Sequence, residues 1–144
     1  MTKLRMIALV GMMALGPAGT GAAAAETVSG PADVRDEVTV AIGGARYRLQ
    51  GVEVGGDARC GASVCGDAAA EALRQWIGAE PLSCDKLSRL GHGFFLARCR
   101  TASGEDLGRK LLEEGIARPG EGADAAYIEA SDGAKAAHRG QWAQ

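Results

Sequence analysis

The sequence predicts an α+β domain in which five short strands form a barrel and about three helices pack around it. Two observations favour this class. Apolar and polar side chains alternate over 38–49 on either side of Gly43-Gly44, as in a half-buried hairpin. Over 67–77, apolar side chains instead recur three and four positions apart, which is typical of an amphipathic helix. With 144 residues and only two each of Trp, Tyr and Phe, the chain is expected to form one domain whose core has few large groups.

The other elements follow from the same signals. Strands are expected over 38–42, 45–49, 81–85 and 94–100 with a short last strand at 116–117, and helices over 67–77, 106–114 and 125–138. Asp67 is the expected N-cap of the first helix and Gly78 its terminator, while Asp132-Gly133 interrupts the third helix. The order of two or three strands, a helix, two strands and two helices favours a closed Greek-key barrel of the oligonucleotide/oligosaccharide-binding (OB) type.

The first 25 residues have the pattern of a cleaved secretory signal peptide. Lys3 and Arg5 supply a positive start, and the apolar run over 6–15 is too short to span a bilayer. Small residues over 21–25 then offer a cleavage site after Ala25. We expect the mature chain to be exported to the periplasm or to the outside of the cell, with no membrane span.

The mature chain is expected to hold a lead-in segment at 26–36 and one domain at 37–144. Cleavage removes two basic residues and leaves 14 basic against 18 acidic, a net charge of −4. Residues 81–100 carry a local net charge of +3, whereas residues 101–132 carry −5. This balance argues against strong electrostatic binding of nucleic acid and leaves a weak, salt-sensitive footprint around 81–100.

Export places the four cysteines in an oxidising compartment, where disulfides are expected. Zinc is the alternative, but there is no C-x2-C, and His92 and His138 lie at no finger-like spacing. Four cysteines allow three pairings. The turn expected around 90–93 lies midway between the third and fourth cysteines and sets them opposite each other, which leaves the first two as the second pair. The expected bridges are Cys60–Cys65 and Cys84–Cys99.

Several segments stand in an order that a known family shares. They are residues 43–52, 65–69, 76–78, 95–99, 105–107, 111–117, 127–130 and 134–142. The first reads as a Gly43-Gly44 turn followed by A-R-Y-R-L-Q-G-V, and the last ends in R-G-Q-W. Together they resemble the staphylococcal nuclease (thermonuclease) family over about residues 30 to 143. The resemblance implies an OB-type barrel, and the four cysteines are similar to those of exported bacterial members.

Active members of that family hydrolyse DNA and RNA phosphodiesters with calcium, using two aspartates, a glutamate and two arginines. In this chain the first aspartate falls on Val38, the second on Glu53, and the glutamate on Gly56. The strand arginine is retained as Arg48, and the second arginine is His92. The resemblance therefore implies a degenerate site. Arg48 and His92 are catalytic only if activity survives, and no cofactor is expected except calcium in that case.

Neighbouring carboxylates offer a partial replacement for the lost ones. Asp57 follows Gly56 directly, and Asp36 precedes Val38 by two positions. The candidate metal ligands are therefore Asp36, Glu53 and Asp57. Because all of them would have to turn toward one point to hold calcium, we expect that catalysis is lost.

Individual residues also have simpler interpretations. Arg48, Glu53 and His92 each fit an ordinary exposed residue on a strand or turn. Phe94 and Phe95 must point to opposite faces of their strand. One of them is expected in the core, and the other is a candidate for stacking on a ligand.

Three functions follow from these observations. The first is a catalytically degenerate thermonuclease-like domain that binds a protein or another ligand in the cell envelope. The second is an atypical calcium-dependent endonuclease acting on DNA or RNA. The third is an OB module that binds an oligonucleotide or a glycan weakly.

Overall fold

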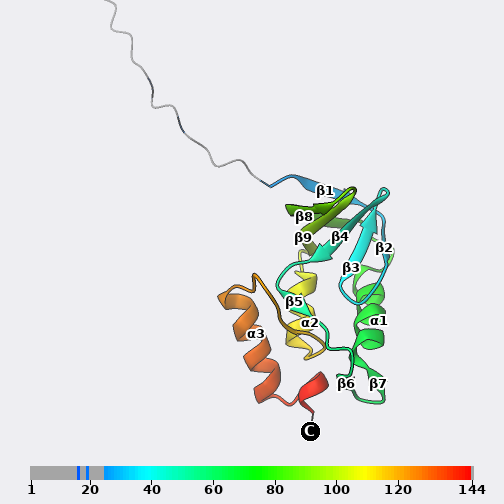
Figure 1. Ribbon diagram of the computed structural model, residues 1–144, viewed down its shortest axis with the longest axis vertical. Coiled ribbons are helices and arrows are strands. Elements are labelled where there is room, and N and C mark those ends of the chain that lie inside the picture. The colour runs from blue at the N-terminus through cyan, green and yellow to red at the C-terminus, as the bar shows by residue number, and fades with distance from the viewer. Residues whose placement is uncertain (1–15, 17–18, 20–24, 144) are drawn as a thin grey trace, which may run out of the picture.

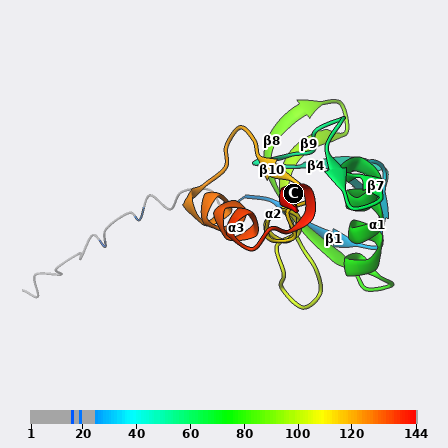
Figure 2. The same cartoon turned by 90° about the horizontal axis from the view of Figure 1, so that it is seen from below.

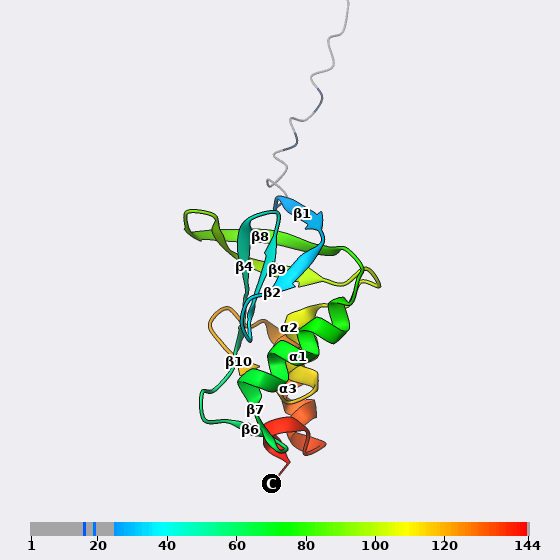
Figure 3. The same ribbon diagram turned by 90° about the vertical axis from the view of Figure 1, so that its right-hand side faces the viewer.

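A computed structural model describes residue 16, residue 19 and residues 25–143. Most of the expected signal peptide therefore lies outside the described residues. A curled sheet forms one end of the molecule and three α-helices form the other (Figures 1 and 3).

The largest sheet has six strands in the order β1-β8-β9-β4-β3-β2. These strands are β1 (Thr27–Gly30), β2 (Ala32–Val34), β3 (Thr39–Ile42), β4 (Ala45–Leu49), β8 (Leu82–Gly91) and β9 (Phe94–Arg100). Two short pairs lie outside this sheet: β5 (Val52–Glu53) with β10 (Arg118–Pro119), and β6 (Arg59–Cys60) with β7 (Ser63–Val64). The α+β class is confirmed. The expectation of five strands is wrong, because the segment before β3 and the short pairs add further strands.

The two edge strands of the large sheet, β1 and β2, are consecutive in sequence and are separated only by Pro31. Proline has no backbone N–H to donate to a neighbouring strand, so it suits a position between two strands that pair with different partners. One segment thus pairs with β8 at one edge and with β3 at the other, which curls the sheet and brings its edges together. Residues 26–36, expected as a lead-in, hold both of these strands.

The hairpin of β3 and β4 forms where the alternation predicts it. Gly43-Gly44 connects the strands, and both glycines have positive φ, +57° and +87°, as this two-residue turn requires. Tyr47 and Leu49 are each 2% exposed, whereas Arg46 and Arg48 face solvent on the other side. The strand therefore offers two arginines from a face that the core does not use.

Helix α1 (Cys65–Ile77) begins two residues before Asp67, so the prediction of Asp67 as its N-cap is wrong. The helix has no side-chain cap, and the preceding loop instead satisfies its first N–H, because the N–H of Cys65 donates to the carbonyl of Ala58 at 2.8 Å. Asp67 lies in the first turn, where its negative charge interacts favourably with the positive end of the helix dipole. Gly78 ends the helix with a φ of +56°, as predicted.

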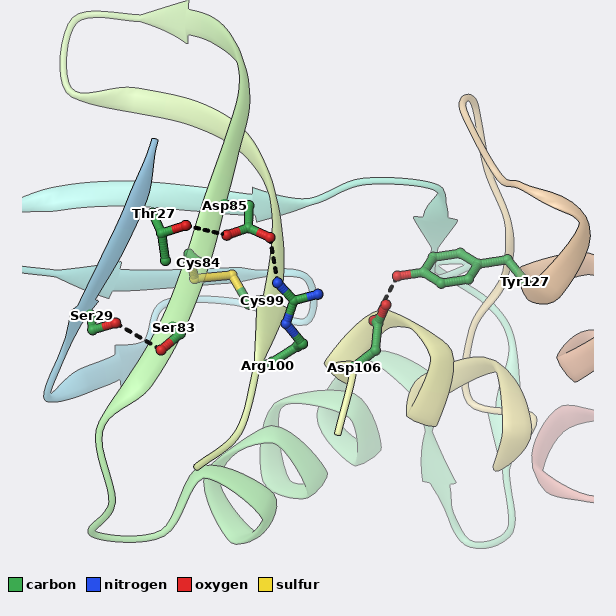
Figure 4. Close-up of a disulfide and its surroundings, with 9 residues drawn as sticks. All are labelled: Thr27, Ser29, Ser83, Cys84, Asp85, Cys99, Arg100, Asp106 and Tyr127. Atoms are coloured by element: carbon green, nitrogen blue, oxygen red, sulfur yellow. Dashed lines mark hydrogen bonds and ion pairs between the residues drawn. A yellow bond between two sulfur atoms is a disulfide. The ribbon is translucent and has the colours of Figure 1, made fainter. Parts of the chain in front are cut away.

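The predicted hairpin of 81–85 and 94–100 is longer than expected, because β8 continues to Gly91. Cys84 lies opposite Cys99 in the register, and a disulfide joins them (Figure 4). A second disulfide joins Cys60 and Cys65. Both pairings agree with the prediction, and two disulfides fit an exported protein.

The two C-terminal α-helices, α2 (Leu107–Glu113) and α3 (Ala125–Ala136), each begin at an aspartate. Asp106 accepts a hydrogen bond from the N–H of Arg109 at 3.1 Å, and Asp124 accepts one from the N–H of Tyr127 at 3.0 Å. Helix α3 continues through Asp132-Gly133 without a break and ends two residues before the predicted end. A short 3-10 helix, η1 (Gly140–Trp142), follows it. Helix α2 lies between α1 and α3 (Figures 1 and 2).

The last strand, expected at 116–117, lies instead at β10. The N–H groups of Ile116 and Ala117 both donate to the carbonyl of Leu111, so these residues complete the end of α2. The core between the sheet and the helices is mainly aliphatic. Its fully buried side chains include Val40, Leu49, Leu73, Leu82, Leu107, Leu111 and Leu112. Among the described residues, no helix has the length and apolar character that crossing a bilayer requires.

Candidate ligand-binding site

A hollow of about 550 Å³ opens between the end of β4, the β8–β9 hairpin and the loop before α3. Its lining combines three charged side chains, Arg48, Glu53 and Glu121, with the apolar side chains of Leu90 and Leu96. Sites for small ligands commonly pair apolar walls with a few polar groups that fix orientation. The hollow therefore suits a ligand that has both hydrogen-bonding groups and an apolar face.

The backbone around the hollow holds its walls in place. The N–H of Gly120 donates to the carbonyl of Gly51 at 2.9 Å, which ties the loop to the turn after β4. Gly122 has a φ of +80°, and a Cβ at this position would come within 2.7 Å of Nε2 of Gln50. The positive φ favours glycine, and the absence of a side chain lets the loop lie beside Gln50 without moving it.

The charges in the hollow are unequally neutralised. Oε1 of Glu53 accepts a hydrogen bond from Nε of Arg118 at 2.7 Å, so this carboxylate already has a partner. Within residues 25–143, Arg48 and Glu121 form no ion pair with another side chain. Arg48 thus presents the forked N–H donors of a guanidinium to a ligand, and Glu121 presents a hydrogen-bond acceptor.

The other predicted site residues lie elsewhere. Asp36 and Gly56 line a separate hollow of about 340 Å³, and Oδ1 of Asp36 accepts the N–H of Val38 at 2.9 Å. Asp57 is exposed and lines neither hollow. His92 lies at the turn of the β8–β9 hairpin, with Nδ1 3.5 Å from Nη2 of Arg89. Of the five predicted residues, only Arg48 and Glu53 therefore share a hollow.

The carboxylates do not converge. Across residues 25–143, no group of three or more His, Cys, Asp or Glu side chains is placed to hold a metal ion. Asp36, Glu53 and Asp57 thus do not form a calcium site of the kind that the family resemblance implies.

Phe94 and Phe95 lie on opposite faces of β9, as predicted. Phe95 stacks on the buried ring of Tyr47, with 5.8 Å between the ring centroids. Phe94 lies on the outer face of the sheet, where the guanidinium carbon of Arg46 is 4.6 Å from its ring centroid. Phe94 is therefore the phenylalanine that a ligand can reach from outside the core.

Sequence reasoning missed the contribution of the loop before α3. Glu121 stands between Gly120 and Gly122, and the only signal for it was this glycine spacing after the expected last strand. Leu90 and Leu96 were assigned to the hairpin without a role in a site. Their place in the hollow depends on the parallel pairing of β4 with β9, in which Arg48 lies opposite Leu96.

A polar cluster next to the hollow joins β9 to the starts of both C-terminal helices. Nη2 of Arg98 lies 3.0 Å from Oδ2 of Asp124, and its Nε lies 3.7 Å from Oδ2 of Asp106. The hydroxyl of Tyr127 donates to Oδ1 of Asp106 at 2.6 Å (Figure 4). The N–H of Tyr127 and the Arg98 side chain lower the pKa of Asp124. Burial, followed by the hydrogen bond to Asp106, raises the pKa of Tyr127.

The raised pKa of Tyr127 predicts a loss of stability in alkali. The ordinary pKa of the phenol is 10.0, and the folded state holds the proton more tightly. Tyr127 therefore contributes fully to the free energy of unfolding below about pH 10, the ordinary pKa of the phenol. This contribution is lost as the pH rises further, at up to about 1.4 kcal/mol per pH unit. Urea unfolding of the wild type and of Tyr127→Phe, from about pH 8 to about pH 11, measures this. An equally steep fall in the variant would assign the effect to other groups.

No protein-family model matches the chain. Over 108 residues the chain is 34% identical to the succinoglycan biosynthesis protein ExoI of Rhizobium meliloti (strain 1021). The match covers 67% of this chain and 54% of that protein, so the chain spans about half the length of this curated relative.

Proposed function

We propose that this protein is an exported binding module on a thermonuclease-like OB barrel that has lost catalysis. The sheet whose edges meet at Pro31 supports the barrel, and the two disulfides support export. The ligand binds in the hollow that Arg48, Glu53 and Glu121 line.

The separation of the carboxylates carries this proposal. Calcium takes about six to eight oxygen ligands, with several supplied by carboxylates that converge on one point. Here Asp36 binds the N–H of Val38, Glu53 pairs with Arg118, and Asp57 lines neither hollow. The residues present do not fit the ion that the family uses.

A nuclease assay tests the loss of catalysis. We expect the purified protein to cleave denatured DNA no faster with calcium than with a chelator. The matched variant is Arg48→Ala, which removes the one catalytic side chain that the resemblance retains. Calcium-dependent cleavage that Arg48→Ala abolishes would contradict the proposal and establish the atypical endonuclease instead.

Among possible ligands, a glycan has a specific observation in its favour. The relative described above is named for the biosynthesis of succinoglycan, which by its name is a glycan. The chemistry of the hollow agrees, because sugar hydroxyls can donate to Glu53 and Glu121 and accept from Arg48. A phosphodiester group has no proton to donate to these two carboxylates.

We expect Arg48→Ala to weaken binding of an oligosaccharide about tenfold or more. A hydrogen bond to a charged group contributes about 1.5–3 kcal/mol, which corresponds to at least a tenfold change in affinity. Calorimetric titration with a hexamer of galacturonic acid and with its methyl-esterified counterpart measures the effect. Arg109→Ala is the matched control, because Arg109 is exposed on α2 and does not line the hollow. Equal binding by both variants would contradict the proposed site.

A further inference from the structure

We infer that Arg46 and Phe94 form a second subsite, beside the hollow, that binds a carboxylate carried by the same glycan chain. This inference rests on the proposed function and names the chemical class of the ligand. It assigns an acidic glycan to a surface that is built from the outer face of β4 and β9.

The register of the sheet places the subsite next to the hollow. Arg46 lies opposite Phe94, and Arg48 lies opposite Leu96, in the parallel pair of β4 and β9. Side chains at alternate positions of a strand share a face, so all of these groups lie on the face opposite to the buried Tyr47. The two arginines are two positions apart, which is about 6.6 Å along the strand. A single extended ligand can therefore contact both.

Arg46 is held in a defined position before any ligand binds. Its guanidinium carbon lies 4.6 Å from the ring centroid of Phe94. Its backbone N–H donates to the carbonyl of Gly93 at 2.8 Å, which fixes the strand against the hairpin turn. An arginine stacked on a ring by its face keeps its N–H edges available, and these edges match the two oxygens of a planar carboxylate.

The charge of Arg46 is not used inside the protein. Lys86 also stacks on a phenylalanine, Phe95, but it forms an ion pair with Glu26 at 3.2 Å. Arg98 and Lys110 stack on aromatic rings as well, and both pair with carboxylates. Lys135 stacks on Trp142 and forms no ion pair among the described residues, but it lies near the end of α3 and does not line the hollow. Within residues 25–143, Arg46 forms no ion pair, and it lies on the same face as the hollow. A carboxylate on the ligand would supply the missing partner.

The surroundings favour an acidic glycan over a nucleic acid. Glu53 and Glu121 supply hydrogen-bond acceptors in the hollow beside Arg48. A ligand that carries hydroxyl donors beside its carboxylates can use both these acceptors and the two arginines, whereas the phosphodiester groups of a nucleic acid have no proton to donate.

Calorimetric titration of the exported chain with three probes tests the inference. The probes are hexagalacturonate, its methyl-esterified counterpart with the same sugar backbone, and a thymidine dodecanucleotide. We expect Arg46→Ala to lower the affinity for hexagalacturonate at least tenfold and to leave the affinity for the neutral ester within about twofold of the wild type. Arg46→Lys keeps the charge but loses the planar fork, so its affinity for hexagalacturonate should lie between those of the wild type and Arg46→Ala. Because Arg46 is exposed, the melting temperature should not change and serves as the folding control.

The other outcomes separate this inference from the proposed function. If Arg48→Ala weakens both oligosaccharides but Arg46→Ala weakens them equally or not at all, the subsite is refuted and the hollow stands. If the wild type binds neither oligosaccharide, the hollow and the subsite are both refuted. Tighter binding of the oligonucleotide, with a steep salt dependence that Arg46→Ala reduces, would replace the glycan by a nucleic acid.

Discussion

Removal of the Cys84–Cys99 disulfide is expected to lower the free energy of unfolding by about 3 kcal/mol. The bridge closes a loop with a sequence separation of 15, and the chain-entropy model assigns about that value to such a loop. Both cysteines are fully buried and join β8 to β9 in the middle of the sheet (Figure 4). Urea unfolding of the Cys84→Ala/Cys99→Ala double variant measures the change, which is a large part of the stability of a small domain.

The other disulfide supplies a matched control. Cys60 and Cys65 are separated by only 5 positions, so the same model assigns about 2 kcal/mol to their bridge. Cys65 is as buried as Cys84 and Cys99, but Cys60 is partly exposed, so this double replacement removes less buried volume. We expect Cys60→Ala/Cys65→Ala to be the milder double variant. The reverse order would mean that the β6–β7 loop, rather than the centre of the sheet, depends on its cross-link.

The features that the sequence predicted correctly are those that depend on neighbours in the chain. The Gly43-Gly44 hairpin follows from alternation and from two positions that need positive φ. The cysteine pairing follows from a turn midway between Cys84 and Cys99. Residues 27–34 were not predicted as strands, because their partners are distant. Thr27, for example, pairs with Asp85 through both backbone register and a 2.6 Å side-chain hydrogen bond.

The candidate site divides in the same way. The outward direction of Arg48 follows from strand alternation, and its closeness to Glu53 follows from a short turn. Glu121 enters the hollow only because the loop before α3 folds back onto Gly51, nearly seventy positions earlier in the sequence. No local pattern encodes that contact. The same holds for Arg46 and Phe94, whose pairing depends on the parallel contact of β4 with β9.

Asp106→Ala is expected to lower the free energy of unfolding by about 2–4 kcal/mol, although the residue lies outside the hydrophobic core. Oδ1 of Asp106 accepts from two donors, the N–H of Arg109 at 3.1 Å and the hydroxyl of Tyr127 at 2.6 Å. Loss of the helix cap costs about 1 kcal/mol. Loss of the second bond leaves the hydroxyl of a side chain that is 3% exposed without its acceptor, which costs about 1–3 kcal/mol more. Denaturant unfolding of the variant measures the sum.

A double-mutant cycle with Tyr127→Phe separates the two contributions. When the hydroxyl is absent, Asp106→Ala should cost only the cap and the ion pair with Arg98, so the two substitutions should couple by about 1–3 kcal/mol. Asp106→Asn is the conservative control, because its side-chain oxygen can still accept both hydrogen bonds while the charge is removed. Additive effects of Asp106→Ala and Tyr127→Phe would show that the hydroxyl finds another acceptor. In that case the position of α3, and of the wall that it forms behind Gly51, would depend on the ion pair of Arg98 with Asp124 instead.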